Sequence, residues 1–202
     1  MSDSQEAYSK LYIPSDGVWF DPMDPDPEKM DIDTIAHGLA TEFRYGGHTD
    51  PLVNVAQHAV DTSTLLQELG YDERLQFYGL HHDSSEAYTG DLQKPNKEVI
   101  QSVDGFEDAW QEAVWDFLGV EAPDEAQYKA VKDVDYQLFG YEVEKLFENR
   151  EHAEETLENV GVPEWAVNDE IPDIDDIIDF DKGVEQSREE FLDRHEELVK
   201  RI

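Results

Sequence analysis

The segment YGLHHDSSEAYTGD, residues 78–91, concentrates side chains that bind metals or transfer protons. His82 and Asp83 are adjacent, Glu86 follows three residues after Asp83, and Asp91 comes five residues later. Because the chain has no cysteine, a divalent ion would have to be held by imidazoles and carboxylates. On a helix, Glu86 stands beside both His82 (i+4) and Asp83 (i+3). The spacing therefore predicts a metal site with a further carboxylate next to it.

Two residues on predicted apolar helix faces extend this set. His58 shares a face with apolar residues, so it is either a hydrogen-bonded core histidine or a ligand. Asp135 lies inside the apolar stripe of another helix, where an unpaired carboxylate would cost several kcal/mol. It therefore needs a cation or a hydrogen-bond network. A set of two imidazoles and two carboxylates suits a six-coordinate ion that keeps room for water and substrate oxygens; its members are His58, His82, Asp83 and Asp135.

The elements that must position these groups are predicted to be helices, because apolar residues recur at i, i+3 and i+4 and strand patterns are hard to find. About six helices are expected, over residues 31–43 (with Asp33 as N-cap), 54–69, 72–88, 106–118, 124–147 and 184–202. The predicted fold is a single all-α domain spanning residues 1–202. Residues 1–30 form an extended arm packed by Tyr12, Trp19 and Phe20, and residues 150–202 a C-terminal loop and helix that pack on the bundle.

Charge is the most unusual property of the composition. The chain has 50 acidic residues against 15 Lys plus Arg, a net charge of −35, spread along its whole length. Such a field repels nucleic acids and anionic membranes, and it destabilises a compact state unless salt screens it. We therefore expect no nucleic-acid duplex or membrane as partner, and a salt-rich cytoplasm such as that of a haloarchaeon or of a cell infected by its virus. An acidic mesophilic protein is the alternative.

Two further features support a soluble, intracellular protein as the expectation. No apolar run approaches the ~20 residues that span a bilayer. The N-terminus MSDSQEAYSK lacks a signal-peptide pattern.

The order H…HD…D on helices resembles the HD-domain superfamily of metal-dependent phosphohydrolases. A longer pattern, RYGGHT…NVAQHAV…LHHDSSEAYTGDLQKPNK…VDYQLF, resembles the branch that includes bacterial 5′-deoxynucleotidases and their phage-encoded relatives. The phage-type proteins also carry a Pro-rich N-terminal arm. The resemblance covers most of the chain and is weakest from about residue 150 onward. An HD pair alone is a weak signal, whereas HDxxExxxxD followed by Pro95 and Lys97 is specific.

The resemblance implies a role for each matched residue within an HD-domain helical bundle. Glu86 matches the acid that positions or activates the attacking water, and Asp91 the acid near the leaving group. Arg44 matches the arginine that neutralises the substrate phosphate, and Tyr45 replaces a neighbouring aromatic residue that is often Trp. The family's metal ligands match His58, His82, Asp83 and Asp135.

Residues 46–48 depart from the family pattern next to Arg44, which leaves base and sugar selectivity open. His48 is a candidate substrate-binding residue that either contacts phosphate or caps the loop. Because the protein is so acidic, a dianionic substrate needs a local positive island, for which Arg44, Lys94, Lys97 and the metal are the candidates. The remaining histidines are assigned to packing, ligand support or surface positions: His37, His81, His152 and His195.

The expected function is hydrolysis of a small nucleotide phosphomonoester, a (deoxy)nucleoside 5′-monophosphate, with one divalent ion among Mn, Co, Zn, Mg and Fe. A phosphodiesterase of cyclic or oligonucleotides is one alternative. Two-metal HD enzymes usually add histidines before the final Asp, and none occurs here between His82 and His152. The second alternative is a non-catalytic, metal-stabilised interaction module. Such a module would not need Glu86, Asp91 and Arg44. A homodimer is also considered, because the apolar stripe at 106–118 fits either an interface or an internal core.

Overall fold

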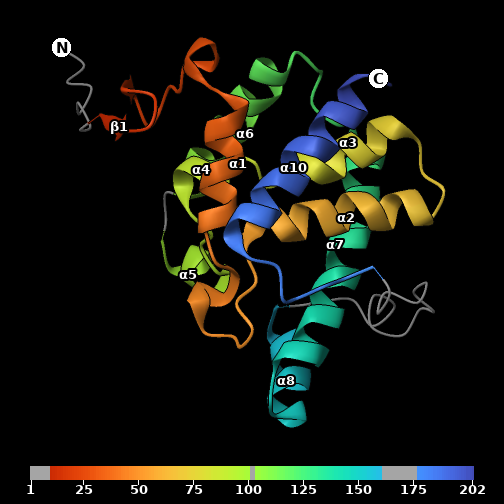
Figure 1. The fold of residues 1–202 in the computed structure, drawn as a ribbon. Helices are drawn as coiled ribbons and strands as arrows, with labels where there is room; N and C mark the ends of the chain where they lie inside the picture. The colour runs from red at the N-terminus through yellow and green to blue at the C-terminus, as the bar shows by residue number, and fades with distance from the viewer. Residues whose placement is uncertain (1–9, 101–102, 161–176) are drawn as a thin grey trace.

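The chain folds mainly into helices, as seen in a computed structural model that describes residues 10–100, 103–160 and 177–202 (Figure 1). The helices are α1 (Ile32–Thr41), α2 (Val55–Glu68), α3 (Glu73–His81), α4 (Glu86–Thr89), α5 (Lys94–Val99), α6 (Val103–Leu118), α7 (Glu125–Leu146), α8 (Arg150–Val160) and α10 (Val184–Val199). Short 3-10 turns, η1 (Pro27–Lys29) and η2 (Arg44–Gly47), flank α1. The predicted all-α bundle with an N-terminal arm is confirmed. The expected acidic loop at 161–176 lies outside the described residues.

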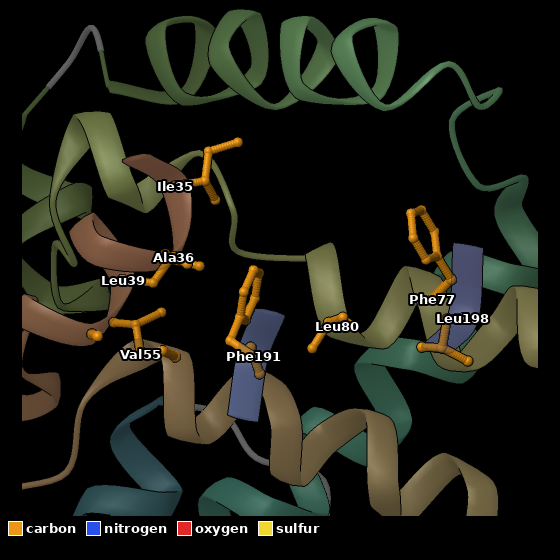
Figure 2. Close-up of a cluster of buried hydrophobic side chains, with 11 residues drawn as sticks. Ile35, Ala36, Leu39, Val55, Phe77, Leu80, Phe191 and Leu198 are labelled. Atoms are coloured by element: carbon orange, nitrogen blue, oxygen red, sulfur yellow. The ribbon is translucent and has the colours of Figure 1, made fainter. Parts of the chain in front are cut away.

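The centre of the bundle is formed by α1, α2, α3 and α10, which pack against one another. Figure 2 shows the apolar side chains that these helices bury together, and burial of such surface is the main favourable term in folding. The cluster includes Ile35, Leu39, Val55, Phe77, Leu80, Phe191 and Leu198. The predicted C-terminal helix therefore does pack on the bundle, whereas α8 lies beside the far part of α7 (Figure 1).

The contact between α2 and α3 is close because α3 carries a glycine there. A Cβ atom added at Gly79 would meet Leu66 Cδ1 at 2.3 Å and Ser63 Cα at 3.6 Å, so a larger residue would require the Leu66 side chain to shift. This approach brings His58 of α2 and His82, directly after α3, to a ring-centroid distance of 5.5 Å. Helix packing thus assembles the two imidazoles that the spacing had singled out.

The N-terminal arm is more ordered than the extended loop that was expected. Residues 11–20 form a hairpin in which β1 (Leu11–Ile13) pairs antiparallel with β2 (Val18–Phe20). Gly17, at φ 67°, allows the turn between them. Of the three aromatic residues expected to pack the arm, Phe20 is fully buried against Trp110. Tyr12 and Trp19 stack on each other but stay largely exposed.

The helix predicted over 72–88 is divided in two, which corrects that expectation. Helix α3 ends at His81 and α4 begins at Glu86. Between them, the backbone N–H of Ser85 donates to Gln111 Oε1 of α6 instead of continuing the helical ladder. A tertiary partner therefore replaces the local one, and His82 and Asp83 lie on a turn between helices.

Smaller differences from the prediction concern the ends of elements. Asp31, not Asp33, caps α1, because its carboxylate accepts the N–H of Thr34. Asp124 caps α7 as expected, and its partner Gln127 completes a capping box. Helices α5 and α8 were not predicted, so the region from residue 150 begins as a helix and not as a loop.

The apolar stripe of α6 faces the inside of the molecule. Trp110, Ala113 and Val114 are buried in a cluster with Phe20 and Met30 of the arm. This stripe is therefore used by the internal core, and it does not argue for a dimer interface. Among the described residues, no helix combines the length and the apolar character needed to cross a membrane.

Folding is predicted to depend strongly on salt, because 50 acidic residues repel one another with only 15 Lys plus Arg to offset them. Helical circular dichroism and the thermal midpoint should rise steeply between low salt and molar KCl, where the Debye length falls to ~3 Å. A melting curve that does not move across this range would refute the inference of a salt-rich origin.

A second stability prediction concerns Asp61, a buried carboxylate that is not one of the candidate metal ligands. Asp61 Oδ1 of α2 lies 3.6 Å from Lys182 Nζ, which contacts Glu190 Oε2 of α10 at 2.9 Å. Burial raises the pKa of Asp61 to about 7, although the charge of Lys182 lowers it. The unfolded carboxyl has a pKa of ~3.9. Its contribution to stability is therefore complete below about pH 4 and lost as the pH rises through about 7.

We expect Asp61→Asn to remove this dependence. The difference in unfolding free energy between variant and wild type should shift in favour of the variant by about 3 kcal/mol between about pH 5 and about pH 8. Urea unfolding at molar KCl measures it. A difference that stays constant with pH would contradict the assignment.

Candidate functional site

Two imidazoles present their Nε2 atoms to a common centre. His58 is fully buried, and its Nδ1 lies 2.9 Å from Glu142 Oε1. His82 Nδ1 donates to the Gly79 carbonyl at 2.7 Å. Because a carboxylate and a carbonyl can only accept, both Nδ1 atoms carry a proton. A hydrogen bond on one ring nitrogen sets the tautomer and leaves the other nitrogen as the metal-binding atom. Both Nε2 atoms are therefore oriented for the centre.

Two carboxylates complete the centre from the turn after α3 and from α7. Asp83 Oδ2 lies 3.1 Å from His82 Nε2. Asp135 Oδ1 lies 3.0 Å from His58 Nε2 and 3.7 Å from His82 Nε2. One ligand atom each from His58, His82 and Asp83 falls within 4.8 Å of the others, a group that could hold a metal ion. The structure thus brings the four predicted ligands to one place.

Unsatisfied polar atoms at this centre fit a divalent cation. His82 Nε2 is buried and has no hydrogen bond among the described residues. Asp83 Oδ2 lies close to it, but the two atoms lack hydrogen-bond geometry. Glu86, which is not one of the grouped ligands, also has a buried Oε2 without a hydrogen bond to any described residue. Unpaired buried polar atoms are costly, so they point to a missing partner. Two nitrogen and two oxygen donors suit a borderline or hard divalent ion.

The charges around the centre also favour cation binding. Burial lowers the pKa of His82, but the negative charges of Asp83 and Asp135 raise it to about 10. The pKa of His58 is raised as well, by Glu142 and Asp135 against burial and a nearby arginine. The pKa values of Asp83 and Asp135 are lowered despite burial, by His82 and by a neighbouring lysine respectively. The positive charge of the protonated imidazoles thus compensates the negative charge of the carboxylates, as a bound metal ion would.

A cavity of about 590 Å³ opens beside the centre. Its polar part is lined by the candidate site residues Arg44, Asp83, Glu86, Asp91, Lys97 and Asp135. Four aromatic side chains are also part of the lining: Tyr45, Tyr136, Phe139 and Phe147. A volume of this size accommodates a small organic ligand such as a nucleotide.

Glu86 and Asp91 have the protonation properties that proton transfer needs. Burial raises the pKa of Glu86 well above its usual value, and the charges of Asp83 and Asp91 add to this effect. Burial also raises the pKa of Asp91, against the opposite influence of Arg44. The backbone N–H of Asp91 donates to a Glu42 carboxylate at 3.2 Å, which holds the residue at the cavity. Both carboxyls can therefore hold or release a proton closer to neutral pH than exposed ones.

Arg44 and Tyr45 reach the cavity from the strained turn η2. Tyr45, Gly46 and Gly47 all have positive φ (57°, 62° and 70°), which the two glycines adopt readily and tyrosine does not. Tyr45 is kept there by its hydroxyl, which donates to Glu142 Oε2 at 2.6 Å, and by its ring, which stacks on Phe139. Gly46 and Gly47 thus have a conformational role in this turn.

The other predicted residues take different places. Lys97 lines the cavity, but its Nζ lies 3.1 Å from Glu107 Oε1 and 3.9 Å from Glu86 Oε1, so carboxylates already compensate its charge. His48 is exposed and is not among the described residues that line the cavity. His81 is buried and lies 3.0 Å from a His195 nitrogen, consistent with a packing role.

Two residues of α7 that sequence analysis did not select belong to the site. Lys132 pairs with Asp135 and lines the cavity. Glu142 accepts from His58, Tyr45 and Arg44. Lys132 lies three residues before Asp135 and Glu142 seven residues after it, so all three share one face of the helix. Helical periodicity could therefore have indicated both residues.

Comparison with known proteins finds relatives without assigned activity. No protein-family model matches the chain. It is 38% identical over 92 residues to an uncharacterized protein of Rhodobacter capsulatus, covering 42% of this chain and 45% of that protein. It is 36% identical over 69 residues to the uncharacterized protein YfdR of Escherichia coli K12, covering 34% and 36%. The chain thus spans less than half of either relative.

Proposed function

We propose that this protein hydrolyses a nucleotide phosphomonoester, with a divalent ion held by His58, His82, Asp83 and Asp135. One observation carries the proposal. The same cavity that reaches this ligand group also contains two carboxyls with raised pKa values and an arginine. A site that served only to stabilise the fold would need neither the acids nor the cavity.

The side chains have complementary roles in this reaction. A bound divalent ion would polarise a phosphate oxygen and lower the pKa of a bound water. Glu86, whose Oε2 has no hydrogen-bond partner among the described residues, orients the attacking water and accepts its proton. Asp91 supplies a proton to the leaving alkoxide oxygen, which its raised pKa favours. Arg44 offsets the charge of the phosphate.

The shape of the cavity supports a nucleoside monophosphate as substrate. Arg44 and Lys132 offer positive charge to a phosphate, and the aromatic side chains that line the same cavity offer a face on which a base can stack. The deoxynucleoside 5′-monophosphates are proposed from the family resemblance. One metal and a monoester are proposed because no histidine lies between His82 and His152.

A phosphate-release screen tests the proposal. Ribo- and deoxynucleoside monophosphates are incubated with Mn²⁺, Co²⁺, Mg²⁺ or Zn²⁺ at molar KCl, since we also propose a salt-rich cytoplasm as the setting. Deoxynucleoside 5′-monophosphates should release phosphate faster than diphosphates or cyclic nucleotides. Release from cyclic nucleotides alone would favour the phosphodiesterase. Inactivity on every nucleotide, with metal bound, would favour the interaction module.

A further inference from the structure

Glu142 joins the candidate metal group to the arginine of the cavity. It is 1% exposed and lies on α7, two turns after Asp135. Its Oε1 lies 2.9 Å from His58 Nδ1. Its Oε2 accepts from Arg44 Nε at 3.0 Å and from the Tyr45 hydroxyl at 2.6 Å, and it lies 3.0 Å from Arg44 Nη2. The two oxygens thus serve different sides of the site.

We propose that Glu142 is a positioning residue that sets the metal-binding tautomer of His58 with one oxygen and aims Arg44 into the cavity with the other. Neither contact brings Glu142 itself to substrate or metal, so its effect is indirect. The half that concerns Arg44 rests on the proposed function, whereas the half that concerns His58 requires only that a metal binds.

The proposed effect on His58 follows from which of its ring nitrogens donates a hydrogen bond. His58 has two ring nitrogens, and a neutral imidazole protonates one of them. A carboxylate at Nδ1 accepts a hydrogen bond only if Nδ1 carries the proton. Nε2, which is hydrogen-bonded to Asp135 Oδ1 at 3.0 Å, is then the nitrogen that gives up its proton when a cation binds. Outer partners of this kind typically change metal affinity by ~10- to 100-fold when replaced.

The proposed effect on Arg44 follows from the chemistry of its guanidinium, which donates hydrogen bonds and cannot accept them. Arg44 donates its Nε–H to Glu142 Oε2 and holds Nη2 3.0 Å from the same oxygen, in a mostly enclosed place where the guanidinium needs an ionised partner. The same oxygen holds the hydroxyl of Tyr45, whose φ of 57° costs free energy that this contact and aromatic packing must offset. Loss of the carboxylate would therefore release the whole turn.

An amide of the same shape cannot satisfy both sides, which makes Glu142→Gln informative. If the amide oxygen faces Arg44 and Tyr45, its NH₂ group faces His58 Nδ1 and selects the tautomer with a protonated Nε2. If the oxygen faces His58, the NH₂ group opposes the N–H groups of Arg44. Either orientation sacrifices one function.

The experiment measures binding and needs no nucleotide. Titration calorimetry at molar KCl gives the affinity of full-length wild type and Glu142→Gln for Mn²⁺, and then of the Mn²⁺-loaded proteins for inorganic phosphate. We expect the variant to lose at least ~10-fold in one of the two affinities. Glu142→Asp, which keeps the charge, should retain more of both. Glu144→Gln, on the exposed face of the same helix, is the matched control and should behave as wild type.

A measurement on the wild type covers the case in which Glu142→Gln fails to fold. In the Zn²⁺-loaded protein, ¹⁵N chemical shifts should report a protonated Nδ1 on His58. A bare Nδ1, or a folded Glu142→Gln protein whose two affinities match wild type, would overturn the inference. A wild type that binds Mn²⁺ or phosphate at least ~10-fold more tightly than Glu142→Gln does, but hydrolyses no nucleotide, would support the inference and refute the proposed function.

Discussion

Asp83→Ala is expected to abolish stoichiometric metal binding and all hydrolysis while the helical fold persists at high salt. Asp83 lies on the turn between α3 and α4, with its Oδ2 3.1 Å from His82 Nε2, so its loss removes a ligand without opening the core. It also removes the charge that does most to raise the pKa of His82. Elemental analysis, circular dichroism and phosphate release measure the three consequences.

His82→Ala should give the same result, and Asp108→Ala on the exposed surface of α6 is the control for loss of one negative charge. If the Asp83→Ala protein still binds one ion per chain, the ligand assignment is wrong. If it binds no ion but keeps full activity, the metal has no part in the reaction.

Glu86→Gln should keep the metal and lose turnover. Glu86 is not assigned as a ligand, and its Oε2 has no hydrogen-bond partner in the described part of the chain. The amide has almost the same shape but cannot take a proton, so kcat should fall by ~10²-fold or more, with a smaller change in KM. Steady-state kinetics on a nucleoside monophosphate, with metal content determined on the same sample, provide the measurement.

Glu112→Gln, an exposed position on α6, is the matched control and should be active. Turnover by metal-loaded Glu86→Gln equal to that of wild type would exclude Glu86 as the group that acts on water. Loss of the ion in this variant would instead make Glu86 a ligand. These two results separate a catalytic role from a metal-binding one.

The helices and the four candidate ligands were predictable because their signals are local. Apolar periodicity marks the buried face of each helix, and a carboxylate within such a face, as at Asp135, signals a buried partner. The adjacent His82 and Asp83 could be recognised as a pair without knowing what packs on them. The pattern around Arg44 could be recognised as well, but not the strained turn that presents it.

The features that could not be predicted from the sequence depend on contacts between residues far apart in the chain. The division between α3 and α4 follows from Gln111 of α6, which replaces a local hydrogen bond at Ser85. The apolar stripe of α6 could have faced a partner, and the arm covers it instead. Periodicity states which face of a helix is buried, but it does not state what lies against that face.

Glu142 shows the same limit within the site. Its partners Arg44 and His58 are 98 and 84 residues away, so no spacing near Glu142 could reveal them. Helical periodicity places Glu142 on the same face as Asp135, but it does not state which residues pack against that face. Residue types and their spacing were enough to indicate which side chains could bind a metal. Packing decided which nitrogen of each imidazole faces the centre, because hydrogen bonds to Glu142 and to the Gly79 carbonyl occupy the other.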